Sequence, residues 1–331
     1  FLLGGPVRRD ATSAKISAWL IATADGRQVW AKAFKRSLEA AELIETQEEI
    51  ATSVVAALGS EHGVIAQRLA AESRKKRPTE LSTYEAMLSY HSYQMAPSPS
   101  ASGPCFEALK AAVEREPKYG PAWSALATLY CQMYVFDAPG FDDPLATGLS
   151  YAQRGVFLEP GRQLRRLILA YASLLHDAFD TFQSEAHTTL SLNPNNPYAV
   201  GAIGYMHVLA GDFEQGCRLL DRATAASPVL PRWFSHGYYL ACFQRGDYQG
   251  AFDTLNAGDD TEPWQPLLIS AALGKLGRLD EAAESNSTLL YRKPDFGSRA
   301  RELLRRSVKS AELVEELIDG LKRTGMAISD A

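Results

Sequence analysis

Cysteine is scarce in this sequence, and no apolar run is long enough to form a membrane-spanning helix. The 331 residues include four cysteines, Cys105, Cys131, Cys217 and Cys242, with no CxxC spacing. We expect them to be small buried apolar residues rather than a disulfide framework or a metal site, which fits a reducing compartment. A spanning helix needs roughly 20 apolar residues, and no signal peptide precedes the first predicted strand. The sequence therefore predicts a cytoplasmic protein without a membrane partner.

A basic excess is also missing. The formal net charge is -5, whereas proteins that bind phosphate backbones usually carry an excess of Lys and Arg. The basic run from Arg74 to Arg77 lies in a charged linker, predicted over 74–80, and is typical of a solvated helix end. Direct binding to nucleic acid is therefore not expected.

Catalytic motifs are absent as well. The sequence holds no GxxxxGK[ST], HExxH or GxSxG motif, and no GxGxxG that leads from a strand into a helix. Acid pairs such as Asp142-Asp143 and Asp259-Asp260 fall in turns, where turn chemistry explains them. Its histidines are scattered without metal-ligand spacing: His62, His91, His176, His187, His207 and His236. We therefore predict no enzyme activity, no metal and no cofactor for this chain.

What the sequence does contain is a repeat of about 34 residues. The stretch from Asn195 to Pro228 is typical of two short amphipathic helices, joined by a Gly-Asp-Phe turn and closed by proline. Prolines recur at the same interval, at Pro160, Pro194 and Pro228. This period, with small and large apolar residues at set offsets, indicates tetratricopeptide (TPR) repeats. The predicted fold is mainly α: a right-handed TPR solenoid, in which each helix pair must stack on others to bury its apolar face.

Six such helix pairs are predicted over residues 81–294. They close near Pro117, Pro160, Pro194, Pro228, Pro263 and Pro294. Within pairs, a residue that tolerates the left-handed region is expected at the turn, and Asp is expected to cap the next helix. The turns are Gly211-Asp212, Gly246-Asp247 and Gly277-Arg278, with His176-Asp177 in the third pair. Residues 295–331 are expected to form capping helices with charged outer faces, and Gly320 to kink its helix or allow close packing.

One turn is longer than the others. Residues 131–147 insert roughly nine residues, including Pro139-Gly140, between the helices of the second pair. Insertions of this kind project from one edge of a solenoid. The loop is either a contact element or a tolerated surface loop.

Residues 1–73 predict a small, incomplete α/β domain. Two runs rich in strand formers flank Asp25-Gly26, a strong hairpin signal that places Trp30 and Phe34 on one face. A helix is predicted over residues 41–58. So few elements cannot cover both faces of a sheet. Either more chain precedes Phe1, or a second protomer covers the sheet edge and residues 1–60 form a homodimer.

Three motifs in this part carry a resemblance to a known family. LLGGPVRRD, LIATADGRQVWAKAFKRS and LIETQEEIATSVVAAL resemble the segment before the repeats in a group of bacterial signalling proteins, with Pro6 replacing a usual Ser. The group includes class III adenylate or guanylate cyclases and winged-helix transcription regulators, each with a C-terminal TPR array. ELIDGLKRTGM also resembles the group's closing motif. The resemblance implies that this chain corresponds to the region after the output domain, without the metal-ligating aspartates of a cyclase.

The same resemblance implies a partner-binding surface. In TPR arrays the concave face is lined by the first helix of each pair. Mapping those offsets onto this sequence gives Gln132, Tyr171, Tyr198, Tyr205, Arg232, Ser235, Tyr239, Phe243, Trp264 and Lys275. Tyr, Trp and Arg dominate binding hot spots, although repeat aromatics also simply pack between helices. Ser124 and Thr128 replace members of the clamp that holds a C-terminal carboxylate in chaperone-binding relatives, so that ligand is not expected.

We therefore expect a non-catalytic regulatory module of a bacterial signalling protein that binds a protein or peptide, including the output domain of its own parent. Two alternatives remain open at this point. The chain is the regulatory tail of a nucleotide cyclase, or it is a homodimerisation scaffold of a transcription regulator.

Overall fold

The computed structural model describes residues 1–9, 13–37, 51, 54, 64–73, 76–95, 99–227, 230–255 and 264–329. The chain divides into two compact units, residues 1–77 and residues 78–331. Most of the helix predicted over residues 41–58 lies outside the described residues, as do Pro228, Pro263 and the Asp259-Asp260 pair.

The first unit contains a four-stranded antiparallel sheet, β1 (Leu2–Gly4), β2 (Val7–Arg9), β3 (Ser13–Ile21) and β4 (Gln28–Ser37). β1 and β2 pair with the two halves of one edge of β3, and β4 pairs with its other edge. The strand predicted at the start of the chain is therefore interrupted at Gly5-Pro6. Pro6 has no N–H to donate, and a Cβ on Gly5 would lie 1.7 Å from the Ser17 carbonyl oxygen.

The hairpin predicted at Asp25-Gly26 joins β3 to β4. Gly26 has a φ of 69°, and the Ala22 N–H donates to the Arg27 carbonyl oxygen at 2.9 Å. As predicted, Trp30 and Phe34 share a face, which also carries Leu20 because Leu20 pairs with Trp30. Helix α2 (Val64–Ser73) belongs to the same unit and contacts the hairpin through an ion pair between Arg68 and Asp25.

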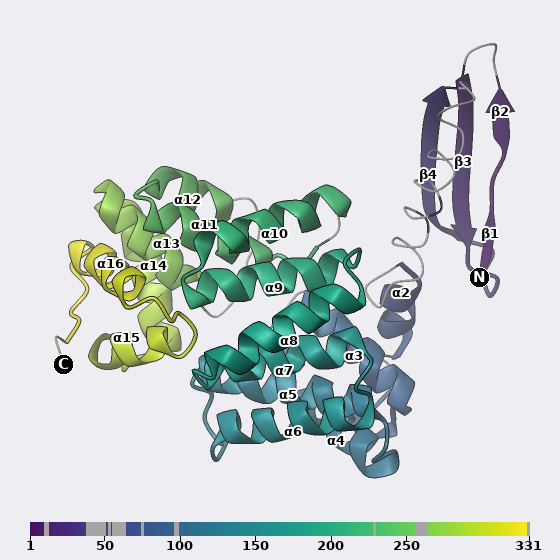
Figure 1. Ribbon diagram of the computed structural model, residues 1–331. Coiled ribbons are helices and arrows are strands. Elements are labelled where there is room, and N and C mark those ends of the chain that lie inside the picture. Colours follow the sequence, from purple (N-terminus) through teal and green to yellow (C-terminus); the bar gives the residue numbers. More distant parts are fainter. Residues whose placement is uncertain are drawn as a thin grey trace. The chain divides into compact units, whose positions relative to one another are not determined.

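The second unit is a stack of antiparallel helix pairs (Figure 1). A short 3-10 turn, η1 (Pro78–Glu80), precedes it. The six predicted pairs are α3 (Thr83–Met95) with α4 (Pro99–Arg115), α5 (Gly120–Val135) with α6 (Pro144–Leu158), α7 (Gln163–Leu175) with α8 (Phe179–Leu192), α9 (Pro197–Ala210) with α10 (Phe213–Ala226), α11 (Phe234–Gln244) with α12 (Tyr248–Leu255), and α13 (Gln265–Leu276) with α14 (Leu279–Arg292). A last pair, α15 (Phe296–Arg305) and α16 (Ala311–Arg323), follows. The predicted fold class, a mainly helical TPR-like array after a small sheet, is confirmed.

The turns inside the pairs have the chemistry that the repeat predicts. Gly211, Gly246 and Gly277 have φ values of 93°, 78° and 72°, and Asp177 replaces glycine in the third pair with a φ of 58°. Asp212 caps α10 by accepting a hydrogen bond from the Gln215 N–H at 3.2 Å. These residues form the turns and are not candidates for a binding site.

Gly320 allows close packing and does not interrupt its helix. Helix α16 runs without a break from Ala311 to Arg323. A Cβ on Gly320 would lie 2.4 Å from the Ala271 carbonyl oxygen, and a Cβ on Gly274 would lie 1.9 Å from the Gly320 carbonyl oxygen. The two glycines therefore let the backbones of α13 and α16 touch.

The inserted loop makes internal contacts. Asp137, at a φ of 50°, accepts hydrogen bonds from Lys293 and Arg299 and forms an ion pair with Arg306 at 2.8 Å. The hydrogen bond from Arg299 is the largest of the effects that hold the pKa of the Asp137 carboxyl well below its usual range. The loop after α5 is thereby tied to α15, more than 150 residues along the chain.

A second set of contacts runs along the same edge. The segment between α15 and α16 supplies donors to the carbonyl oxygens that end three earlier helices. Arg306 donates to Tyr134 at the end of α5 at 2.7 Å, and the Lys309 side chain donates to Leu175 at the end of α7 at 3.1 Å. The backbone N–H of Lys309 donates to Leu209 near the end of α9 at 2.7 Å. Cations near helix C-termini also interact favourably with the helix dipoles. The segment between α15 and α16 therefore holds the ends of α5, α7 and α9 together.

Candidate functional site

Five half-buried aromatic side chains come from successive helix pairs and form what we call the aromatic strip. They are Tyr171 on α7, Tyr198 and Tyr205 on α9, Trp233 just before α11, and Trp264 just before α13. The Trp233 ring lies 5.3 Å from that of Tyr205 and 6.3 Å from that of Tyr198. Tyr171 and Trp264 pack against one cluster of buried side chains that includes Ile168. Such rings provide apolar area and a polar group at low entropy cost.

Trp233 is the residue of the strip that the repeat offsets missed. They placed Arg232 at this position, and Arg232 is exposed one residue away. The Trp233 indole N–H donates to the backbone carbonyl oxygen of Gln94, at the end of α3, at 3.3 Å. The strip therefore already holds a polypeptide carbonyl, supplied by the chain itself. The signal available in the sequence was residue type, because Trp is enriched in binding hot spots.

Polar side chains lie beside this contact. Gln132 on α5 donates to the Gln94 side chain at 3.4 Å. The Gln94 Nε2 and the Gln132 Oε1 atoms are buried and make no hydrogen bond. Each such unpaired group costs about 1–3 kcal/mol. A buried amide donor and a buried amide acceptor thus lie near the strip, on two side chains that are hydrogen-bonded to each other.

Three of the predicted site residues lie where a partner does not reach them. Tyr239 and Phe243 are 0% and 1% exposed in the core, and the Tyr239 hydroxyl donates to the Leu268 carbonyl oxygen at 2.6 Å. The Lys275 side chain is 6% exposed and lies 2.6 Å from Glu316 and 2.5 Å from Asp319, both on α16. Helix α16 packs on α13, which explains why this part of the predicted face is covered.

The other predicted residues retain solvent contact. Gln132, Tyr171, Tyr198, Tyr205, Ser235 and Trp264 are half-buried, and Arg232 is exposed. The Ser235 hydroxyl donates to the Arg232 carbonyl oxygen at 2.7 Å. These seven residues and Trp233 are accessible, wholly or in part, to solvent.

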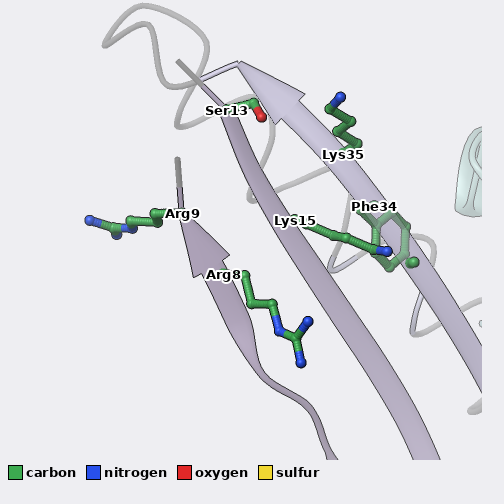
Figure 2. Close-up of a pocket in the computed structure, with 7 residues that line it drawn as sticks. Arg8, Arg9, Ser13, Lys15, Phe34 and Lys35 are labelled. Carbon is green, nitrogen blue, oxygen red and sulfur yellow. The ribbon is translucent and has the colours of Figure 1, made fainter. Parts of the chain in front are cut away.

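The sheet of the first unit has a separate, strongly basic feature. Arg8 pairs with Lys15, and Lys15 pairs with Lys35, so three cations lie in one row across β2, β3 and β4. Figure 2 shows these side chains with Arg9 and Ser13 around a shallow hollow. Residues 1–37 carry seven Lys and Arg against two Asp. Like charges directly opposite each other destabilise a sheet. The positive potential of this row attracts anions.

The buried titratable groups are those of a packed core. Burial raises the pKa of the Cys105 and Cys131 thiols to about 12 and lowers the pKa of His236 to about 4. Over the described ranges, no three His, Cys, Asp or Glu side chains come together in a way that could hold a metal ion. The helices described are each too short or too polar to cross a bilayer.

No established protein family and no curated protein matches this sequence. Solved structures with a similar arrangement of helices include a chain of the APC/C hetero-tetramer Cut9-Hcn1, with a TM-score of 0.48 and 14% identity, over 86% of this chain and 57% of that one. Another is a chain of Naa15/Naa10 bound to HypK-THB, with a TM-score of 0.30 and 18% identity, over 78% of this chain and 36% of that one. The chain thus spans less than two thirds of either.

Proposed function

We propose that this chain is a non-catalytic scaffold that binds a polypeptide segment of a partner protein along the aromatic strip. The observation that carries the proposal is the contact of Trp233 with the Gln94 carbonyl oxygen, flanked by the rings of Tyr198 and Tyr205. The indole N–H is already bonded to Gln94, so this site offers a partner segment the large apolar surface of the indole and the two tyrosine rings. Gln132, Tyr171, Arg232, Ser235 and Trp264 extend this surface.

We propose further that the scaffold regulates the output of a bacterial signalling protein, and that its partner is a protein or peptide, including the output domain of the same polypeptide. The support is the resemblance of the three motifs in residues 1–58 and of the closing motif. A regulatory tail of a nucleotide cyclase and a homodimerisation scaffold of a transcription regulator follow from the same motifs. Light scattering with and without residues 1–77 tests the homodimer, because only the longer chain should then be dimeric.

The binding proposal is tested by selecting random peptides of about 15 residues on the purified chain and titrating the best binders by fluorescence anisotropy. Trp233→Ala and Tyr205→Ala should each weaken binding at least about tenfold, as hot-spot substitutions do. Tyr291→Ala is the matched control, because Tyr291 on α14 is 88% exposed and should leave binding unchanged. Selection of no peptide, or equal losses for the strip and the control, would contradict the proposal.

A further inference from the structure

Helices α10 and α11 pack with their side chains in a defined register. The Tyr238 hydroxyl donates to Asp221 at 2.9 Å across the contact between them. One helical turn is about 3.6 residues. One turn back along α10 from Asp221 lies Cys217, and one turn forward along α11 from Tyr238 lies Cys242. Because successive helices of the stack run antiparallel, these steps run in the same direction and bring the two cysteines to one side of the contact between α10 and α11.

Arg245, the residue that follows α11, contacts one thiol and lies near the other. Its Nη2 donates to the Cys242 Sγ at 3.4 Å. The side chains of Arg245 and Cys242 both lie close enough to the Cys217 thiol to act on its pKa. Burial is the largest effect on the Cys217 thiol and raises its pKa; Arg245 opposes this rise, whereas Asp221 adds to it.

Exposure separates these two cysteines from the other two. Cys217 and Cys242 are half-buried, whereas Cys105 and Cys131 are 1% and 0% exposed. All four are free thiols. A half-exposed thiol beside a guanidinium is the environment in which a thiolate forms and meets an oxidant, and a second thiol next to it can resolve the product.

We propose that Cys217 and Cys242 form a redox site that a hydroperoxide converts to a disulfide between α10 and α11. Arg245 donates to the Cys242 sulfur, which attacks the peroxide as the thiolate; a sulfur–oxygen bond forms, the peroxide bond breaks, and one water or alcohol leaves. The Cys217 sulfur then attacks the sulfenic sulfur. The sulfur–sulfur bond forms, the sulfur–oxygen bond breaks, and a water carries away the second oxygen. Two thiols lose two electrons and two protons, and the peroxide takes them up.

The position of the disulfide gives it a structural consequence. It would join the second helix of one pair to the first helix of the next, at the opposite end of α11 from Trp233. Oxidation would therefore fix the angle between the two repeats that supply Tyr198, Tyr205 and Trp233 to the aromatic strip. The inference does not rest on the proposed function, because the cross-link forms or fails whether or not a partner binds.

The test is intact-mass analysis of the full chain after brief treatment with hydrogen peroxide. The mass should fall by about 2 Da, a reductant should reverse the change, and a non-reducing peptide map should show Cys217 joined to Cys242. Cys105 and Cys131 are internal controls and should still be alkylated after unfolding. In Cys217→Ala a dimedone adduct should accumulate on Cys242, and Arg245→Met should slow oxidation at least about threefold.

Two results would overturn the proposal. One is oxidation of Cys217 and Cys242 to separate sulfinic acids with no cross-linked peptide. The other is cross-linking that involves Cys105 or Cys131 as fast as it involves the proposed pair, because this would show unfolding rather than a site. Circular dichroism before and after treatment distinguishes a folded reactant from an unfolded one.

Discussion

Lys309 forms an ion pair with Asp177, whose 66% exposed side chain belongs to the turn between α7 and α8. The Nζ atom of Lys309 lies 2.8 Å from the Asp177 Oδ1 atom, and the lysine side chain is 5% exposed. Asp177 occupies the left-handed turn after α7, with a φ of 58°, and Lys309 also donates to the Leu175 carbonyl oxygen at 3.1 Å. The Lys309 ammonium thus neutralises the Asp177 carboxylate and donates to a carbonyl oxygen that has no partner within α7.

Replacing Lys309 by Met should lower the free energy of unfolding by about 1–3 kcal/mol, chiefly because the buried Leu175 carbonyl oxygen loses its donor; the ion pair with the exposed Asp177 adds little. Urea unfolding followed by circular dichroism measures the change. Lys118→Met is the control, since Lys118 is exposed, and it should change stability by less than about 0.5 kcal/mol. Equal effects of the two substitutions would show that Lys309 does not hold the edge of the array.

Asp137→Asn should destabilise the chain at neutral pH and have little effect in acid. Asn tolerates the left-handed region as Asp does, so the substitution removes charge without adding backbone strain. The pKa of Asp137 is held well below its usual range, first by the hydrogen bond from Arg299 and then by Lys293 and Arg306. The stability that the charged Asp137 contributes is fully present above the unfolded-state pKa of about 3.9. It is lost as the pH falls toward the lower pKa of the folded state.

The measurement is urea unfolding of both proteins between pH 6 and pH 2.5. The difference in unfolding free energy should be about 1–3 kcal/mol at pH 6 and should narrow below about pH 4. A difference that stays constant over this range would mean that Asp137 acts through the loop backbone and not through its charge.

His236 should make stability depend on pH in a higher range. Burial lowers the pKa of His236 to about 4, so the folded ring stays neutral while the unfolded ring binds a proton below about pH 6.5. The stability that comes from the neutral ring is present above pH 6.5 and is lost as the pH falls toward 4. Between pH 7 and pH 5 the free energy of unfolding should drop by about 2 kcal/mol.

His236→Leu should remove this drop and leave a flatter profile over the same range. Calorimetry or urea unfolding at several pH values makes the comparison. His187→Leu serves as the control, because His187 is exposed on α8 and should leave the slope unchanged. A wild-type profile that is already flat from pH 7 to pH 5 would contradict the role of His236.

Gly320→Ala should separate α16 from α13. The added Cβ would lie 2.4 Å from the Ala271 carbonyl oxygen, which is a backbone atom and cannot turn aside. We expect a loss of about 2–3 kcal/mol, visible as a lower Tm. Gly161→Ala is the matched control, because a Cβ there meets no atom within 4 Å and should change stability by less than about 0.5 kcal/mol. A Gly320 variant as stable as the control would show that the two helices can move apart at no cost.

Lys15→Gln should stabilise the sheet, because Lys15 lies between Arg8 and Lys35 in one row. The gain is expected at about 0.2–1 kcal/mol and should shrink at high salt, where the repulsion is screened. Hydrogen exchange of the β3 and β4 amides reports it. Lys32→Gln is the control: Lys32 pairs with Ala18 and lies 5.0 Å from the Phe34 ring, so its removal should not stabilise the sheet. Slower exchange in the control than in Lys15→Gln would reverse this interpretation.

The local structure of the array could be predicted from sequence because it depends on residues close together in the chain. A left-handed turn needs Gly, Asn or Asp at one position, as at Gly211 and Asp177, and a cap needs Asp212 one residue later. The Asp25-Gly26 hairpin follows the same logic. The interruption of the first strand at Gly5-Pro6 was written in the sequence too, since proline cannot donate to a strand ladder.

The candidate site was predicted less well, because a repeat offset specifies a helix face but not what covers it. Tyr239, Phe243 and Lys275 have the offsets of a binding face, yet the first two are buried and α16 covers the third. Trp233 was missed because it lies just before α11, where the offset of a regular helix does not apply. Only the packing of neighbouring repeats decides which face stays open.

Short-range chemistry thus determined the helix pairs, their turns and the hairpin. The tertiary structure alone decided the contacts that close the array's edge, namely Asp137 with Arg306 and Lys309 with Asp177. These partners are more than 130 residues apart, and small rotations between successive repeats add up before they meet. No local sequence pattern specifies the accumulated rotation between repeats. The pairing of these charges therefore follows only from the complete stack of helices.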